Sequence, residues 1–306
     1  MKKDIVSIIT TFYNAEQFII HTLASVYSQI VDKDKFEIEY VLVDDHSPDN
    51  SRKLVEAFMQ KHNIKDRWKI VKPEKNLGCG GARRFGIQNA TGDYFMFIDA
   101  DDYYINRDFV LRAYNTIVSE KADIVEYGVL YNQPNGTQQN NTAPRKFVIQ
   151  NNKHLSEIAL FKDNLIKFNV WSKIYKRWIV ESFEYSDERT FEDVMTIPVW
   201  VYNANKIVIM PTPEINYRAA SNSIIRTDWT KTRLGTIKAI ASHFERFKDD
   251  YDLLKAMYQR AMIDLENVLS NKSSECEGFV EMSKLNTYML KYIYPKTWQE
   301  KTYNPE

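Results

Sequence analysis

The stretch "NLGCGGARRFGIQNATGDYFMFIDADD", residues 76–102, joins a helical pattern to a strand that ends in acids. We predict a helix over "GGARRFGIQNA" and a strand over "YFMFID". Three carboxylates, at positions 99, 101 and 102, directly follow residues whose side chains mostly avoid water. Like charges at this spacing repel one another, so we expect a positive partner beside them.

The alternation of short β-rich runs with helical patterns extends over the first 130 residues. This order is typical of a parallel sheet that is covered by helices. The predicted strands are 5–10, 39–45, 67–71, 94–99, 122–131 and, later in the chain, 206–211. We therefore expect an α/β protein with a Rossmann-like, mostly parallel sheet flanked by helices.

Helical patterns connect these strands. Residues 47–62 open with Ser47 as a predicted N-cap and Pro48 in the first turn. Further helices are predicted at 15–30, at 106–120 and from about Phe191 to Asn203. The segment "NQPNGTQQNNTAP" (132–144) is predicted to be a loop, because it is rich in turn-forming residues.

The composition bounds the size of the fold and the kinds of partner. The chain has 306 residues, of which 44% are hydrophobic and 27% charged, which permits a sizeable core and suggests about two domains. Lys plus Arg equals Asp plus Glu at 41 each, so no overall field attracts nucleic acid or anionic lipid. We expect no nucleic-acid partner and at most peripheral membrane association.

Cysteine and histidine usage indicates a reducing compartment and argues against zinc. Cys79 and Cys276 are too few for a disulfide framework or a thiolate metal cage, and the five histidines lack H-E-x-x-H spacing. The opening "MKKDIVSIITTF" reads as a strand, because Asp4 and hydroxyl residues interrupt its apolar run. We expect a cytoplasmic protein that associates at most with the inner face of the membrane.

Polar clusters follow three of the predicted strands: "TTFYN" (10–14), "DDHSPD" (44–49) and "DADDYY" (99–104). In open parallel sheets with right-handed crossovers, ligands bind outside the carboxyl ends of the strands. All three clusters are expected at this edge, so the sequence predicts one shared cleft.

The acids at 99–102 suit a divalent cation. Asp99 and Asp101 are expected to point to one side of the strand end, while Asp102 points elsewhere as the chain turns. Carboxylate oxygens suit Mg²⁺ or Mn²⁺, which often take further ligands from phosphate and water. A solvated loop that precedes a helix starting near Asn106 is the alternative reading of an isolated D-x-D motif.

The segment 76–87 supplies Arg83 and Arg84, from a place where a guanidinium can reach a phosphate with two hydrogen bonds. Its glycines do not match the G-x-G-x-x-G dinucleotide fingerprint, and no Walker A loop is present. Phosphate binding is therefore expected to use a metal ion and arginine.

Jointly these motifs resemble the family-2 glycosyltransferases with the GT-A fold. The first motif, "SIITTFYN", resembles the family's S-V-I-I-P-x-Y-N, and the second, "YVLVDDHSPDNS", resembles V-D-D-G-S-x-D-x-S. Residues 76–102 resemble the family run that begins N-x-G-x-x-x-A-R-N and ends L-D-x-D-D. The three motifs occur in the family's order and at its spacing. The continuous match covers about the first 105 residues. Further on, "VWSKIYKR" (170–177) and "TFEDVMT" (190–196) resemble the W-x-K and E-D segments of small-chain members.

The resemblance implies an inverting transfer of a sugar from a nucleotide sugar, most often a UDP sugar, to a hydroxyl of a glycan or lipid-linked acceptor. Cell-surface polysaccharide or glycolipid synthesis is the implied setting. By this resemblance the base and neighbouring ribose are bound by Thr11, Tyr13 and Asp45. Arg83 would reach the base or diphosphate, and Asp99 would face the ribose. Asp101 would bind Mn²⁺ or Mg²⁺, with Asp102 as the second choice of ligand.

The general base implied by the resemblance is Asp193, with Glu192 beside it. Two acids in the first turn of a helix are also common for dipole and capping reasons, and that reading stays open. By the same resemblance Arg218 would touch the diphosphate or close over the donor, while Trp171 and Lys173 would line the acceptor site.

Three departures from the family pattern stand out. Thr11 replaces the common Pro, His46 the usual Gly, and Arg84 the usual Asn after the arginine. We interpret His46 as a loop residue, with a modified base contact as the alternative.

The domain assignment follows the extent of the motifs. Residues 1–229 are expected to form the GT-A catalytic domain, with a nucleotide-sugar part at 1–105 and an acceptor part at 106–229, and residues 230–306 a helical C-terminal region. Two other functions compete with the glycosyltransferase prediction, namely a sugar-phosphate nucleotidyltransferase and a non-catalytic nucleotide-sugar-binding module.

Overall fold

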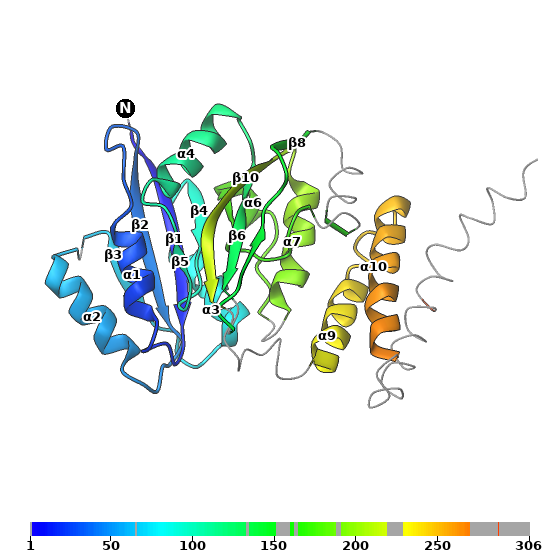
Figure 1. Ribbon diagram of the computed structural model, residues 1–306, viewed down its shortest axis with the longest axis horizontal. Helices are drawn as coiled ribbons and strands as arrows, with labels where there is room; N and C mark the ends of the chain where they lie inside the picture. The colour runs from blue at the N-terminus through cyan, green and yellow to red at the C-terminus, as the bar shows by residue number, and fades with distance from the viewer. Residues whose placement is uncertain are drawn as a thin grey trace, which may run out of the picture. The chain divides into compact units, whose positions relative to one another are not determined.

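The computed structural model describes residues 2–64, 66–132, 135–150, 160–161, 165–187, 191–218, 229–269 and 287 (Figure 1). The chain divides into two compact units. The first comprises Met1–Asn151 and Asn169–Ala220, and the second comprises Asn152–Phe168 and Ser221–Glu306. The domain boundary expected at residue 229 stays a prediction.

The first unit is built around one mixed sheet. Its strands are β1 (Asp4–Phe12), β2 (Phe36–Asp44), β3 (Trp68–Val71), β4 (Tyr94–Phe97), β5 (Tyr103–Tyr104), β6 (Ile124–Asn132), β7 (Gln138–Asn141), β8 (Phe147–Gln150), β9 (Lys173–Lys176) and β10 (Lys206–Arg218). Its helices are α1 (Ile19–Tyr27), α2 (Ser51–His62), α3 (Gly78–Gln88), α4 (Phe109–Ser119), α6 (Arg177–Glu181) and α7 (Glu192–Asn203).

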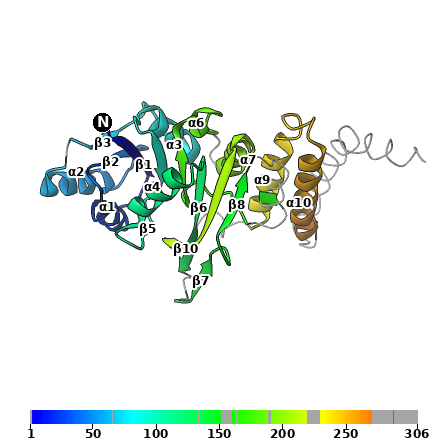
Figure 2. The same cartoon turned by 90° about the horizontal axis from the view of Figure 1, so that it is seen from above.

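The strand order is β3-β2-β1-β4-β9-β6-β10-β5, with β7 paired to β6 and β8 to β10. The first four strands of this order are mutually parallel, as expected of a Rossmann-like sheet with helical crossovers. Strand β9 is antiparallel to both β4 and β6, and it joins the parallel part to the later strands. Among these later strands, β6 and β10 lie side by side (Figures 1 and 2). The predicted α/β class with a Rossmann-like sheet is confirmed.

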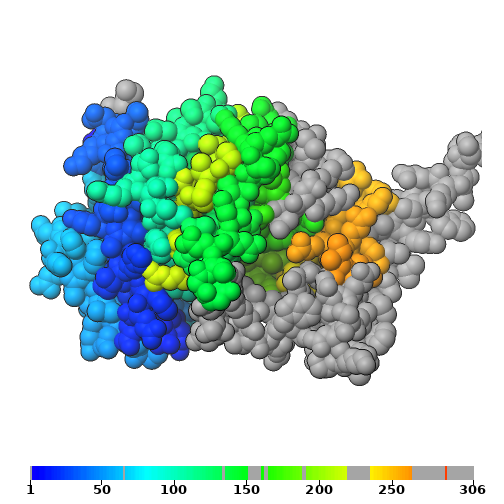
Figure 3. Space-filling model, in the orientation of Figure 1, coloured from blue at the N-terminus to red at the C-terminus, as the bar shows by residue number. Residues whose placement is uncertain are grey.

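The core follows from the apolar content of the strands. Strands β1, β2 and β4 carry near-continuous runs of buried residues, as sheets covered on both faces require. By contrast, the short strand β7 lies at the surface, where it is visible in green in Figure 3, and three of its four residues are exposed.

The second unit is helical in its described part. It contains α9 (Trp229–Ser242) and α10 (Tyr251–Leu269), which pack against each other. Phe244, Leu254 and Met257 are buried in this unit. The helical character expected of the C-terminal region thus holds for these residues. In the described part of the chain, no helix combines the length and apolarity needed to cross a membrane.

Two local predictions are wrong. The helix predicted from residue 47 begins at Ser51, because Ser47 does not cap it: the Ser47 hydroxyl accepts a hydrogen bond from the Asn14 N–H instead, at 2.9 Å. The Ser51 N–H binds the Asp49 carboxylate at 3.0 Å. The loop predicted at 132–144 contains β7, whose polar residues pair with the end of β6 through their backbone.

Helix α3 lies directly on the sheet because Gly86 has no side chain. A Cβ atom at this position would stand 2.6 Å from Cγ2 of Ile9 in β1 and 3.1 Å from Cγ2 of Val43 in β2. These contacts are shorter than ordinary van der Waals distances, so a larger residue must push the helix away from the strands. The helix carries Arg83, so its seating also fixes the height of that side chain above the sheet.

We expect Gly86→Val to reduce the free energy of unfolding by about 3 kcal/mol or more, because the added side chain overpacks the space between α3 and the sheet and displaces the helix from it. Urea denaturation measures the change. Gln88→Val is the matched control, since it introduces the same residue at an exposed position of the same helix. Similar losses in both variants would contradict close packing at Gly86.

Candidate active site

The predicted polar clusters do meet at one edge of the sheet. In the parallel pairs, Phe12 of β1 lies opposite Asp44 of β2, and Ile9 of β1 lies opposite Phe97 of β4. The carboxyl ends of these strands therefore align, and the segments that follow them emerge side by side. The shared edge that the sequence predicted is present in the fold.

The acids after β4 form a compact cluster. One carboxylate oxygen from each of Asp99, Asp101 and Asp102 lies within 4.8 Å of the others. Asp102 is fully buried, while Asp99 and Asp101 are half-buried. Burial, followed by the charge of Asp99, raises the pKa of Asp101 to about 6. Burial and the two neighbouring acids also raise the pKa of Asp102 well above its usual range.

The cluster has the properties of a cation site. Asp102 Oδ1 accepts a hydrogen bond from the Arg218 N–H at 2.9 Å, but its buried Oδ2 has no hydrogen-bond partner in the described part of the chain. An unpaired buried carboxylate oxygen is costly unless a cation or a proton compensates it. Hard oxygen ligands grouped this closely fit Mg²⁺ or Mn²⁺.

Helix α1 holds the acidic turn in place. The Thr22 hydroxyl lies 2.8 Å from the Ala100 carbonyl and 2.7 Å from the Asp102 carbonyl. Strand β1 contributes a further anchor, since the Thr10 hydroxyl donates to the Ile98 carbonyl at 2.8 Å. The backbone that carries the acids is thus fixed by hydroxyl groups from two neighbouring elements.

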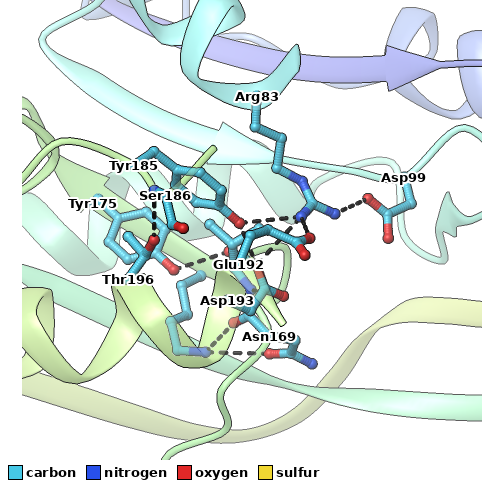
Figure 4. Close-up of polar contacts among 11 residues, drawn as sticks. Arg83, Asp99, Asn169, Tyr175, Tyr185, Ser186, Glu192, Asp193 and Thr196 are labelled. Carbon is cyan, nitrogen blue, oxygen red and sulfur yellow. Dashed lines mark hydrogen bonds and ion pairs between the residues drawn. The ribbon is translucent and has the colours of Figure 1, made fainter. Parts of the chain in front are cut away.

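Arg83 connects this cluster to a second group of acids (Figure 4). Its side chain is buried on α3, and its Nη2 donates to Asp99 Oδ1 at 2.7 Å. Its Nη1 contacts Glu192 Oε1 at 2.5 Å and Asp193 Oδ1 at 3.3 Å, both on the first turn of α7. One guanidinium therefore pairs with carboxylates from two separate parts of the chain.

Asp193, the predicted general base, is largely buried, with 19% of its side chain exposed. Burial raises its pKa to about 6, although the charge of Arg83 acts in the opposite direction. Its Oδ1 accepts a hydrogen bond from the Tyr185 hydroxyl, and its Oδ2 accepts one from the Val170 N–H at 3.3 Å. A carboxyl with a pKa near neutrality suits general base catalysis.

The predicted nucleoside residues lie at the ends of β1 and β2. Thr11 is half-buried in β1, and Tyr13, just beyond the strand, is 56% exposed. Asp45 is buried, and its two oxygens accept hydrogen bonds from the N–H groups of Leu77 and Gly78, at 2.7 and 2.9 Å. Asp45 therefore anchors the start of α3, the helix that carries Arg83.

Two of the three departures from the family pattern have local explanations. His46 has a φ of 65°, a left-handed conformation that favours glycine, and its ring Nε2 lies 2.9 Å from the Pro73 carbonyl. These features are those of a loop residue, the interpretation we favoured. Arg84 forms ion pairs with the exposed Glu184 and Asp187, at 3.6 and 3.2 Å.

The structure also describes the residues that were expected around the donor and the acceptor. The Arg218 guanidinium lies 5.1 Å from the ring centroid of Tyr103 and contacts His21. Trp171 is buried and stacks on Tyr217, with ring centroids 5.5 Å apart. Lys173 is fully buried, 3.3 Å from Glu126, so its ammonium group forms an ion pair inside the fold.

The sequence analysis did not identify two residues that the structure places at the candidate site, Tyr185 and Thr22. Tyr185 is buried between Arg83 and Asp193, and Thr22 fixes the acidic turn. Neither belongs to a motif, and each is about 80 to 100 positions from a partner that it contacts. Only a prediction of the three-dimensional contacts could have found them.

Comparison with known proteins gives a family assignment. The family model described as glycosyl transferase family 2 matches residues 7–174. Among curated relatives, glycosyltransferase GlyG of Streptococcus pneumoniae is 26% identical over 234 residues, which cover 74% of either chain.

Solved structures show the same fold. The crystal structure of Staphylococcus aureus TarS residues 1–349 has a TM-score of 0.68 at 20% identity, over 94% of this chain and 81% of that one. The complex of the same fragment with UDP-GlcNAc has a TM-score of 0.61 at 19% identity, over 94% and 89%. The mannosyltransferase PcManGT of Pyrobaculum calidifontis, in complex with GDP-Man and Mn²⁺, has a TM-score of 0.57 at 17% identity, over 97% and 84%.

We expect Arg83→Gln to reduce the free energy of unfolding by about 3 kcal/mol or more near pH 8, because it leaves several partly buried carboxylates without a cation. The loss should be smaller near pH 5, since Arg83 holds down the pKa of Asp193 and its removal lets that acid take up a proton more readily. Urea denaturation at both pH values measures the difference.

Arg84→Gln is the matched control, because its partners Glu184 and Asp187 are 66% and 63% exposed. Its expected cost is about 0–1 kcal/mol at either pH. Equal effects of the two substitutions would contradict a central role for Arg83.

Proposed function

The chain belongs to glycosyl transferase family 2, and we propose that it is an inverting glycosyltransferase that uses a nucleotide sugar. The observation that carries this proposal is the joining of two carboxylate groups through Arg83. One group, at Asp99 to Asp102, is suited to a metal-bound diphosphate, and the other provides Asp193 as a base. Transfer of a sugar needs both functions within one site.

The proposed donor is a UDP sugar. In this proposal Thr11, Tyr13 and Asp45 bind the base and neighbouring ribose, and Asp99 faces the ribose. Arg83 reaches the base or diphosphate. The TarS complex with UDP-GlcNAc supports a UDP sugar, while the PcManGT complex with GDP-Man keeps GDP as an alternative. The exposed Tyr13 ring offers a surface on which a base can stack.

Asp101 and Asp102 are the proposed ligands of Mn²⁺ or Mg²⁺. The unpaired Oδ2 of Asp102 and the raised pKa of Asp101 both support a cation that compensates these carboxylates. The Mn²⁺ in the PcManGT complex is consistent with this choice. When bound, the cation would neutralise the charge of the leaving diphosphate.

Asp193 is the proposed general base. The oxygen of the acceptor hydroxyl forms a bond to the anomeric carbon, the bond from that carbon to the diphosphate oxygen breaks, and the hydroxyl proton passes to the Asp193 carboxylate. The nucleoside diphosphate leaves with the electron pair. Displacement from the opposite face inverts the configuration at the anomeric carbon.

The acceptor is proposed to be a glycan or a lipid-linked sugar in cell-surface polysaccharide or glycolipid synthesis. The similarity to TarS, a poly(ribitol-phosphate) β-N-acetylglucosaminyltransferase, supports a polymer of the cell surface as the setting. The chain aligns with 34% of the length of that relative, so its acceptor is not transferred to this protein. A cytoplasmic location with at most peripheral membrane contact remains part of the proposal.

We expect UDP with Mn²⁺ to raise the melting temperature by about 2 °C or more at saturating concentrations, because ligands stabilise the state that binds them. Differential scanning fluorimetry with UDP, GDP and dTDP, each with and without Mn²⁺, measures the effect. Asp101→Ala should lose the Mn²⁺-dependent part, whereas the control Asp34→Ala, at an exposed turn, should keep it. Donor-site binding is wrong if no nucleotide stabilises the protein.

We expect Asp193→Asn to lower the transfer rate by about 10²–10⁴-fold, because the amide cannot accept the proton. UDP binding should remain within about twofold, since the base is proposed to act on the acceptor and not on the donor. In the wild type the rate should rise with pH through about 6, where the Asp193 carboxyl loses its proton. Transfer assays across pH with a UDP-sugar panel test this, and full activity of the variant contradicts the role.

A further inference from the structure

The two carboxylate oxygens of Asp193 have different surroundings. Oδ1 accepts a hydrogen bond from the Tyr185 hydroxyl and lies 3.3 Å from Nη1 of Arg83. Oδ2 accepts a long hydrogen bond, 3.3 Å, from the Val170 N–H. Oδ1 is therefore anchored by a hydroxyl and a guanidinium, whereas Oδ2 is the oxygen more readily offered to a new donor.

The Tyr185 hydroxyl occupies a fixed position. It accepts a hydrogen bond from Arg83 Nη1 at 3.1 Å while it donates to Asp193, and a phenol can do both at once. The ring is 1% exposed, and it packs against Trp200 and Phe97 with centroid distances of 5.7 and 6.3 Å. This packing leaves little freedom for the ring to turn away from the carboxylate.

We propose that Tyr185 is a positioning residue for the reaction: its hydroxyl holds Oδ1 of Asp193 and so presents Oδ2 to the acceptor hydroxyl. The inference rests on the proposed function, in which Asp193 is the base. Tyr185 acts through Asp193 and does not touch the reacting atoms. The arrangement also couples Arg83 to the base, because Tyr185 is bonded to both.

The hydroxyl also affects the charge of the base. A hydrogen bond donated to a carboxylate favours its charged form, so the Tyr185 hydroxyl lowers the pKa of Asp193 against the effect of burial. In the described part of the chain, the other titratable or charged groups around Asp193 are Arg83 and Cys79 from α3, Asp99 after β4, Tyr175 from β9 and Glu192 from α7. All of them remain when only the Tyr185 hydroxyl is removed.

A purely structural role makes a different prediction. If the hydroxyl served only to satisfy Arg83 and Asp193 in the buried interior, its removal would lower stability and raise the pKa of Asp193 but leave kcat unchanged at a pH where Asp193 is ionised. Tyr185→Phe separates the two roles, because the ring and its contacts with Trp200 and Phe97 are retained.

Tyr114→Phe is the matched control. The Tyr114 hydroxyl also donates to a carboxylate, Asp4 Oδ2, at 2.8 Å, and its ring is also buried. Asp4 opens β1, at the opposite end of the strand from the candidate site. The control therefore removes the same kind of hydrogen bond away from the proposed chemistry.

The experiment compares the wild type, Tyr185→Phe and Tyr114→Phe in two measurements. Transfer kinetics across pH should show kcat reduced by about tenfold or more in Tyr185→Phe, with KM for the donor within about twofold. ¹³C NMR of labelled aspartate carboxyls, with the Asp193 signal assigned by its absence in Asp193→Asn, should show its pKa raised by about one pH unit. Tyr114→Phe should change neither quantity.

An unchanged Asp193 titration in Tyr185→Phe overturns the proposal, whether or not the protein transfers a sugar. A raised pKa together with wild-type kcat at high pH also overturns it, because positioning is then unimportant for the rate. If the titration shifts as expected but the wild type transfers no sugar from any donor, the contact between Tyr185 and Asp193 is upheld. In that case the proposed function fails, and the positioning role fails with it because there is no reaction for Asp193 to catalyse.

Discussion

A buried guanidinium among three carboxylates is the interaction on which the candidate site depends. Arg83 cannot be buried without anionic partners, and Asp99, Glu192 and Asp193 cannot approach one another without a cation between them. These acids come from a strand end and from a helix that begins almost one hundred residues later. The charge requirement therefore holds together the early and late segments of the first unit.

The two acidic groups solve the problem of like charge in different ways. The group at Asp193 has Arg83, a cation within the chain, as its counterion. Asp101 and Asp102 have raised pKa values, as Asp193 does, but an oxygen of Asp102 is also unpaired in the described part of the chain. One group thus contains the proposed base together with its own counterion, while the other is suited to an external cation. Arg83 joins them through Asp99.

The fold was largely predictable where the local pattern determines it. The early strands and the helix over Arg83 were predicted within a few residues, because buried parallel strands have long apolar runs and their helices have a helical period. The antiparallel strand β9 was not predicted, since four residues have no distinctive period and pairing depends on distant strands. Ser47 failed as an N-cap for a similar reason: its hydroxyl bonds to Asn14, in another loop.

The sequence by itself indicated the α/β class through the order of its strand and helix patterns, and the family through the resemblance of its motifs. That resemblance also implied roles for the acids at 99–102 and 192–193, because motifs are properties of the linear chain. Only the tertiary structure decided that Arg83 binds both groups, that Asp45 anchors the start of α3, and that Tyr185 contacts Asp193. The physical reason is that a hydrogen bond or an ion pair depends on distance in space, and these partners are brought together by sheet pairing and helix packing rather than by neighbouring positions in the sequence.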